Sequence, residues 1–267
     1  KKTFYDMWDN FYAVLLMNIG FIIALSLMLG FSVLIGGVVL PLFLPLESQV
    51  AGFVGWVLIL VAANVIYSVY AGVVGCLTKD ISDGQKATFA AFWQYLKETW
   101  RSSALFGVIQ GLLIALLLNA ANFYLGTINN LIYPLLFFIL LWAYVIWILA
   151  SQYFYPLQAR FDKKLTKNIR KMFILLFDNA GFTIFGLAVA GLITLGISVV
   201  IFILVPGIAT VFLLYNVALK LRLLKYEYLE AHPEVSRKHI PWETLLIDER
   251  EKTGKRSFKS LIFPWKD

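Results

Sequence analysis

The chain has 267 residues, of which 60% are hydrophobic, 16% aromatic and only 15% charged, with a mean hydropathy of +0.78 and a formal net charge of +7. This composition is too apolar for a soluble globular domain and therefore excludes most soluble enzymes. The single cysteine, Cys76, excludes an intramolecular disulfide framework and a cysteine-based zinc site.

Four long stretches contain no charged residue: 10–46, 48–78, 102–159 and 179–219. A membrane-spanning helix needs about 20 apolar residues, so most of these stretches are longer than one crossing requires. Two glycines and two prolines crowd the second half of the first stretch, which predicts one span followed by a re-entrant or interfacial segment over 35–50. The second stretch is typical of a single span.

The two longer stretches each divide into two spans. The third is broken by polar residues near 124–130, and the fourth by Pro206-Gly207, since proline suits the first turn of a helix and displaces the residue before it from helical geometry. We thus predict an all-α polytopic membrane protein, with a tail over 231–267 and a transmembrane domain over 1–230 built as three helical hairpins. Its six spans are expected at about 12–34, 52–76, 103–123, 131–153, 181–204 and 206–224.

The basic residues support the count of six. All 23 Lys and Arg lie at the N-terminus, between spans two and three, between spans four and five, or from Lys220 onward. With six spans, all four segments are on one side, and the opposite loops carry a single charge, Glu47. The positive-inside rule predicts that both termini are cytoplasmic. The net charge therefore indicates topology and contact with the lipid bilayer rather than nucleic-acid binding.

An aromatic, amphipathic segment precedes each predicted hairpin. In 161–173 the apolar side chains share an arc of about 120° of a helical wheel, opposite the basic ones, and 86–101 has a similar face. This pattern is typical of helices lying in the membrane interface, which either anchor the chain or form a ledge that docks another protein. The apolar end of the tail has the same two interpretations. The interface or docking residues that we predict are Phe89, Phe92, Trp93, Trp100, Phe161, Lys163, Lys164, Lys167, Arg170, Lys171, Phe258, Phe263 and Trp265.

The predicted spans contain no Asp, Glu, Lys, Arg or His apart from the cationic end of span six. Ion pumps and proton antiporters usually carry such groups within the membrane, so both are disfavoured. We expect no catalytic residue, metal or cofactor. Amides within the spans either form interhelical hydrogen bonds or line a neutral polar cavity for an uncharged ligand, such as a sugar or a lipid headgroup. The candidate cavity residues are Asn18, Asn64, Gln110, Asn119 and Asn216.

The stretch 153–173, which begins Tyr-Phe-Tyr-Pro-Leu-Gln-Ala-Arg, resembles the central signature of the YesL-like family of bacterial membrane proteins, whose biochemical function is unassigned. The similarity extends from span one to about Glu230 and includes the segment around Phe92 and the turn at 204–207. The resemblance implies a location in the bacterial cytoplasmic (inner) membrane and an accessory role beside a carbohydrate-uptake ABC permease. It supplies no catalytic residues.

Two functions follow as expectations. The first is a non-catalytic accessory or interacting subunit of a carbohydrate-uptake ABC transporter. The alternative is a bundle that binds or transports an uncharged small molecule. A membrane enzyme acting on lipid or glycan ranks third, because no acid, base or metal cluster is predicted to face the bilayer.

Overall fold

The structure is a computed structural model that describes residues 2–43, 49–126, 132–161, 164–200, 206–235 and 240–253. These ranges form helices and contain no strand. Six of the helices are long and apolar enough to cross a membrane, so the chain is an all-α polytopic membrane protein, as the sequence predicts.

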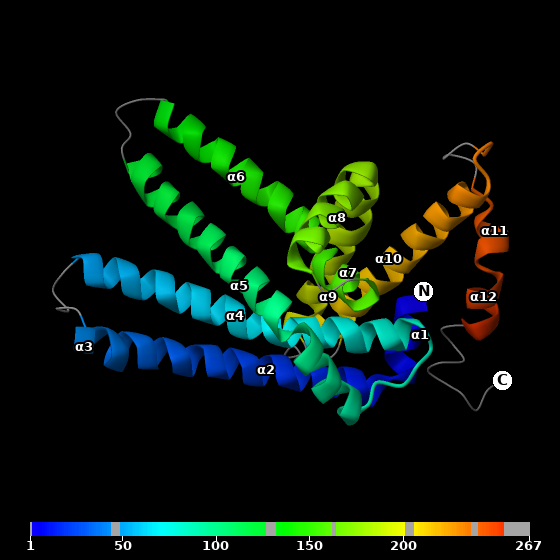
Figure 1. Ribbon diagram of the computed structural model, residues 1–267, viewed down its shortest axis with the longest axis horizontal. Coiled ribbons are helices and arrows are strands. Elements are labelled where there is room, and N and C mark those ends of the chain that lie inside the picture. Colours follow the sequence, from blue (N-terminus) through cyan, green and yellow to red (C-terminus); the bar gives the residue numbers. More distant parts are fainter. Residues whose placement is uncertain are drawn as a thin grey trace.

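The spanning elements are α2 (Phe11–Leu34) with the π-helical turn η1 (Ile35–Val39), α4 (Gln49–Ser82), α5 (Phe89–Gly126), α6 (Ile132–Ser151), η2 (Phe182–Ala188) with α9 (Val189–Val200), and α10 (Gly207–Ala231). The shorter helices are α1 (Lys2–Asp9), α3 (Leu40–Phe43), α7 (Phe154–Arg160), α8 (Leu165–Asp178), α11 (Trp242–Leu245) and α12 (Ile247–Thr253). In Figure 1, α2 runs along α4, and α6 follows α5. These two hairpins extend to the left from the region where α7, α8 and α10 meet.

The segments that follow the first span and precede the third differ from the predictions. Residues 35–43, part of the segment predicted as re-entrant or interfacial, continue the first span as η1 and α3, while 44–48 lie outside the described residues. A π-turn moves the backbone hydrogen bonds from i−4 to i−5, and a proline is tolerated in the first turn of a helix, so Pro41 does not end the helical path. The amphipathic segment before span three is not a separate helix, because α5 is continuous from Phe89 to Gly126.

Small residues allow α4 and α5 to pack backbone against backbone. A β-carbon added at Gly107 would lie 2.6 Å from the carbonyl oxygen of Asn64, and one added at Gly111 would lie 2.7 Å from the Cα of Val61. Small residues spaced by four permit such close approach between spanning helices. Gly107 and Gly111 thus provide the close packing of this pair of helices, whereas a β-carbon added at Gly196 would meet open space.

The short helix α7 lies at the centre of the core. Tyr153, Phe154 and Leu157 are fully buried, and the ring of Phe154 stacks on Phe106 of α5 at 3.7 Å between centroids. On the other side, Gly75 of α4 leaves room for α7, since a β-carbon there would lie 3.0 Å from the Cβ of Tyr155. The predicted fourth span therefore ends two residues early, at Ser151, and the chain turns directly into this buried helix.

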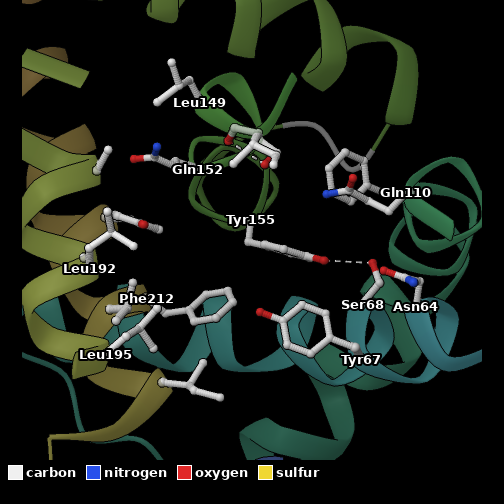
Figure 2. A pocket seen from close by; sticks show the side chains of 18 of the residues that line it. Asn64, Tyr67, Ser68, Gln110, Leu149, Gln152, Tyr155, Leu192, Leu195 and Phe212 are labelled. Atoms are coloured by element: carbon white, nitrogen blue, oxygen red, sulfur yellow. Dashed lines mark hydrogen bonds between the residues drawn. The ribbon is translucent and has the colours of Figure 1, made fainter. Parts of the chain in front are cut away.

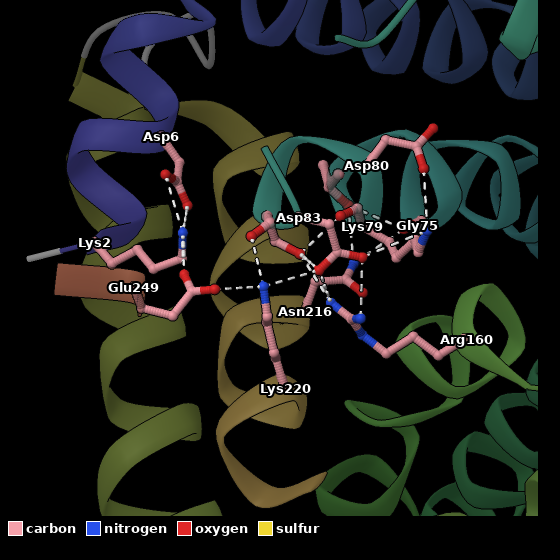
Figure 3. A network of polar contacts seen from close by, with 12 residues as sticks. Lys2, Asp6, Gly75, Lys79, Asp80, Asp83, Arg160, Asn216, Lys220 and Glu249 are labelled. Atoms are coloured by element: carbon pink, nitrogen blue, oxygen red, sulfur yellow. Dashed lines mark hydrogen bonds and ion pairs between the residues drawn. The ribbon is translucent and has the colours of Figure 1, made fainter. Parts of the chain in front are cut away.

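Charged side chains gather where α1, α7 and α12 meet the C-terminal end of α4 and the middle of α10, and we call this region the charged end (Figure 3). Asp83 accepts hydrogen bonds from both terminal nitrogens of Arg160, at 3.2 and 3.1 Å, and lies 3.2 Å from the Nζ of Lys220. Glu249 of α12 lies 2.8 Å from the Nζ of both Lys2 and Lys220. The part of the tail that forms α12 is thereby tied to the bundle.

Burial and charge pairing act in opposite directions on these carboxylates. Burial raises the pKa of Glu249, but hydrogen bonds and charge from Lys2 and Lys220 outweigh it, and the pKa falls to about 2. Arg160 and Lys220 likewise lower the pKa of Asp83 in spite of its burial. Both groups are therefore ionised at neutral pH and hold the cations around them.

Candidate functional site

A cavity of about 540 Å³ lies between the α5–α6 hairpin and the α9–α10 hairpin. Side chains from α4, α7 and η2 complete its lining. Figure 2 shows Tyr67 and Tyr155 directed into the same space from α4 and α7, with Phe212 of α10 beside them. Among the spanning elements, all except α2 with η1 thus contribute to one site.

Fixed hydrogen bonds and aromatic contacts order the inner wall. The hydroxyl of Tyr155 donates to the Oγ of Ser68 at 2.8 Å, and Ser68 donates to the carbonyl oxygen of Ser103 at 2.5 Å. The ring of Tyr155 packs edge-on against Phe106 at 5.7 Å and lies 5.4 Å from that of Phe212. Because these side chains are buried and mutually constrained, this wall is preorganised for a ligand.

Several other polar atoms on the lining have no hydrogen-bond partner among the residues that the structure describes. The hydroxyls of Tyr67 and Tyr215 make no hydrogen bond, and neither does the amide of Gln152, whose Oε1 is buried. Gln110 accepts a 2.7 Å bond from the indole of Trp147, which leaves its amide nitrogen unused. Asn64 donates to the carbonyl oxygen of Leu60, which leaves its Oδ1 unused. Only the Oε1 of Gln152 is both buried and unpaired, and the other atoms are not fully buried. All of them are available to a ligand or to water.

The cavity has no fixed charge. Among the described residues that line it there is no Asp, Glu, Lys, Arg or His, and apart from Ser151 the remaining lining is apolar. An ion placed there would lose its hydration without an opposite charge to replace it, which is strongly unfavourable. The site therefore selects against charged ligands.

Two of the five predicted cavity residues, Asn64 and Gln110, line this cavity, and the other three do not. Asn216 is fully buried elsewhere and donates to the carbonyl oxygen of Gly75 and to Thr78, both at 3.0 Å. Asn119 donates only to the carbonyl oxygen of Ala115 in its own helix. These two amides satisfy backbone and side-chain groups instead of facing a ligand.

Asn18 holds the start of α10. Its Nδ2 donates to the carbonyl oxygen of Pro206 at 3.1 Å, and its Oδ1 accepts from the backbone N–H of Ala209 at 2.9 Å. The amide occupies the space beside Gly207, which has a positive φ of 70° and donates to Ser198. Free N–H groups at a helix start need such partners, so the role of Asn18 is to position α10.

We expect Asn18→Leu to destabilise the protein by about 1–2 kcal/mol, because it leaves buried backbone groups at the start of α10 unsatisfied. Asn119→Leu is the matched control and should change stability by less than about 0.5 kcal/mol, since the carbonyl of Ala115 is already part of a helix. Thermal unfolding of both variants in detergent measures the difference. Equal shifts would contradict the role assigned to Asn18.

Polar lining residues that the sequence analysis missed come mainly from α4 and the start of α7. Tyr67 and Ser68 follow Asn64 at i+3 and i+4, so all three share one face of α4, and Tyr155 follows Gln152 by three residues. This spacing is the sequence feature from which these lining residues could have been predicted. Tyr215 gives no comparable signal, because it lies in an apolar run and reaches the cavity only through the fold.

The predicted interface residues lie at the start of α5, on or just before α8, or outside the described residues. Phe89, Trp93 and Trp100 are exposed along the first turns of α5, whereas Phe92 packs inward. Phe161 is exposed, and the ammonium group of Lys171 lies 4.1 Å from its ring centroid. Lys164, Lys167 and Arg170 are exposed at the start of α8 or on its outer face. Lys163, Phe258, Phe263 and Trp265 lie outside the described residues.

Helix α8 is more than an interfacial anchor. It spans Leu165–Asp178 rather than 161–173, and its apolar face is packed on the protein, with Met172 fully buried and Phe173 in contact with Trp147. The amphipathic pattern thus correctly predicted a helix, but much of its apolar face is covered by other helices.

Comparison of the chain with protein-family models, with curated proteins and with solved structures finds no match. The resemblance to the YesL-like family therefore stays a prediction. In the described part of the chain, no three His, Cys, Asp or Glu side chains are grouped as a metal site would require.

Proposed function

We propose that this protein is a non-catalytic membrane protein that binds an uncharged small molecule in the cavity between its second and third hairpins. The observation that carries the proposal is the set of unpaired polar atoms around a space without fixed charge. Two hydroxyls, the whole amide of Gln152, the amide nitrogen of Gln110 and the amide oxygen of Asn64 offer both donors and acceptors to one ligand. Aromatic and aliphatic side chains supply the apolar contacts that such sites use.

The test removes hydroxyls without changing the shape of the site. We expect the purified protein to carry an uncharged compound that mass spectrometry of its extract identifies, and Tyr67→Phe with Tyr215→Phe to reduce occupancy about tenfold. Two neutral hydrogen bonds contribute about 1–3 kcal/mol, and 1.4 kcal/mol is tenfold. Tyr144→Phe is the matched control, because Tyr144 is a spanning tyrosine outside the lining.

Three results would contradict the proposal. The first is an extract without any compound enriched over that of an unrelated membrane protein. The second is a compound that carries net charge at neutral pH. The third is equal occupancy in the double tyrosine variant and the Tyr144→Phe control.

We further propose that the charged end faces the cytoplasm, in a bacterial inner membrane. Lys2, Lys79, Arg160 and Lys220 come from four separate segments of the chain and share this end. Cytoplasmic segments favour Lys and Arg, which supports the orientation. A cysteine introduced at exposed Lys86 should react with a membrane-impermeant reagent only after cell lysis, and labelling of intact cells would overturn the orientation.

A second candidate function, an accessory subunit of a carbohydrate-uptake ABC transporter, is favoured by the surface of α5. Phe89 is 77% exposed, and Trp93 and Trp100 lie on the same side beside the exposed Lys97 and Arg101. Exposed aromatic rows next to cations suit either headgroups or a protein partner. A photo-crosslinking residue in place of Trp93 should capture a permease subunit in native membranes, whereas crosslinks to lipid alone would remove this candidate.

A further inference from the structure

The rim of the cavity differs from its interior in exposure. Ile148, Leu192 and Leu195 belong to the lining, yet they are 43%, 69% and 37% exposed. All three lie in spanning segments, so the medium around them is hydrocarbon rather than water. In the interior, Ser68 and Phe212 are buried. The cavity therefore opens sideways into the bilayer through an apolar mouth.

The polar interior lies close to the charged end. Tyr215 precedes Lys220 by five residues on α10, which is about 7.5 Å along the helix axis. Lys220 reaches Asp83, so it marks the level of the charged end. Half of a hydrocarbon core is about 15 Å thick, which places Tyr215 in the leaflet next to the charged end and within reach of its headgroup region.

The lining therefore changes from apolar at the mouth to polar inside. A water-soluble solute would have to cross hydrocarbon to reach such a site through the exposed mouth, whereas a lipid of the adjacent leaflet is already present there. An anionic headgroup would find no Lys or Arg among the described lining residues. Tyrosine hydroxyls and a glutamine amide can both donate to and accept from a headgroup hydroxyl.

We propose that the ligand is an uncharged lipid with a hydroxyl-bearing headgroup, drawn sideways from the leaflet next to the charged end. Its headgroup binds beside Tyr67 and Tyr215, and its hydrocarbon chain leaves past Leu192 and Ile148. This inference rests on the proposed function and adds the class of ligand and its route.

The experiment compares three probes by native mass spectrometry of the full chain in detergent: diolein, dioleoyl phosphatidate and maltose. Diolein has the proposed chemistry, the phosphatidate has the same chains with a charged headgroup, and maltose is uncharged but water-soluble. We expect diolein to bind and its occupancy to fall about tenfold in Tyr67→Phe with Tyr215→Phe. Any occupancy by phosphatidate should not depend on these tyrosines, and maltose should not bind.

Neighbouring residues of α9 give a matched test of the route. Leu192 and Ile193 are both exposed, at 69% and 58%, but only Leu192 lines the cavity. Leu192→Trp should narrow the mouth and lower diolein occupancy about tenfold, whereas Ile193→Trp should leave it unchanged. Thermal unfolding midpoints of the two variants verify that both are folded.

The experiments distinguish a failure of the lateral route, of the lipid assignment and of the proposed function. Equal diolein occupancy in Leu192→Trp and Ile193→Trp would overturn the lateral route. Tyrosine-dependent binding of maltose without binding of diolein would overturn the lipid assignment and leave the proposed function standing. Tyrosine-dependent binding of phosphatidate would contradict both, because the proposed site excludes charge.

Discussion

Gly107→Ala is expected to lower the stability of the transmembrane domain by about 1–3 kcal/mol, the usual range for overpacking a tight contact. The new methyl group would lie 2.6 Å from the carbonyl oxygen of Asn64 and 2.8 Å from the Cα of Val65. Both are backbone atoms of α4, so no side chain can rotate away, and the helices must separate. Thermal unfolding in detergent should show a midpoint several degrees below that of the unmodified protein.

Gly30→Ala provides the control for this substitution. Gly30 is also a helical glycine, but nothing lies within 4 Å of its added β-carbon. Alanine is the better helix former by about 1 kcal/mol, so this variant should be as stable as the unmodified protein or more so. Equal loss of stability in both variants would show that the contact of α4 with α5 is looser than described.

The second large effect is expected for Asp83→Asn. Removing one partner of a buried ion pair typically costs about 3–5 kcal/mol, and the partial exposure of Asp83 places the expected loss near the lower end of that range. Arg160 and Lys220 would lose their shared anion, and α7 and α10 would lose a common anchor. The loss should appear in the unfolding midpoint, and partial recovery is expected when Arg160→Gln is added.

Glu227→Gln controls for the change in net charge, because Glu227 is exposed on α10. A similar midpoint in the two variants would mean that the network at the charged end contributes nothing.

Acid should lower the stability in the same way as Asp83→Asn. The pKa values of Asp83 and Glu249 are lowered in the fold, so their contribution is complete above the unfolded values of about 4 and is lost as pH falls through the lowered ones.

The number of spans could be predicted because it depends on charge spacing and apolar length alone. Lys79, Arg101 and Arg160 mark the ends of the uncharged stretches whatever the helices do inside the membrane. The continuity of α5 could not be derived in this way. Charges at Lys97 and Arg101 indicate where the hydrocarbon ends, but the helix has no breaker there and continues beyond it.

The cavity was only partly predictable, since an amide in an apolar run has the same sequence pattern whatever it binds. Asn18 and Asn64 differ only in what the fold places opposite them, which is the start of α10 in one case and an open cavity in the other. Tyr215 adds a hydroxyl to the site because α9 and α10 pack antiparallel, with Gly191 next to its ring. The sequence around a residue does not show which distant segment it will pack against.

The unbroken length of α5 has a mechanical consequence. Trp93, on its exposed aromatic row, and Gln110, in the cavity wall, are 17 residues apart, about 26 Å along a single rod. No break separates them, so the outer turns and the cavity wall belong to one continuous helix, which packs tightly on α4 at Gly107. The aromatic row and the cavity are therefore joined by a single helix, and we expect a partner bound at the row to change the affinity of the cavity for its ligand, and the reverse by the same factor.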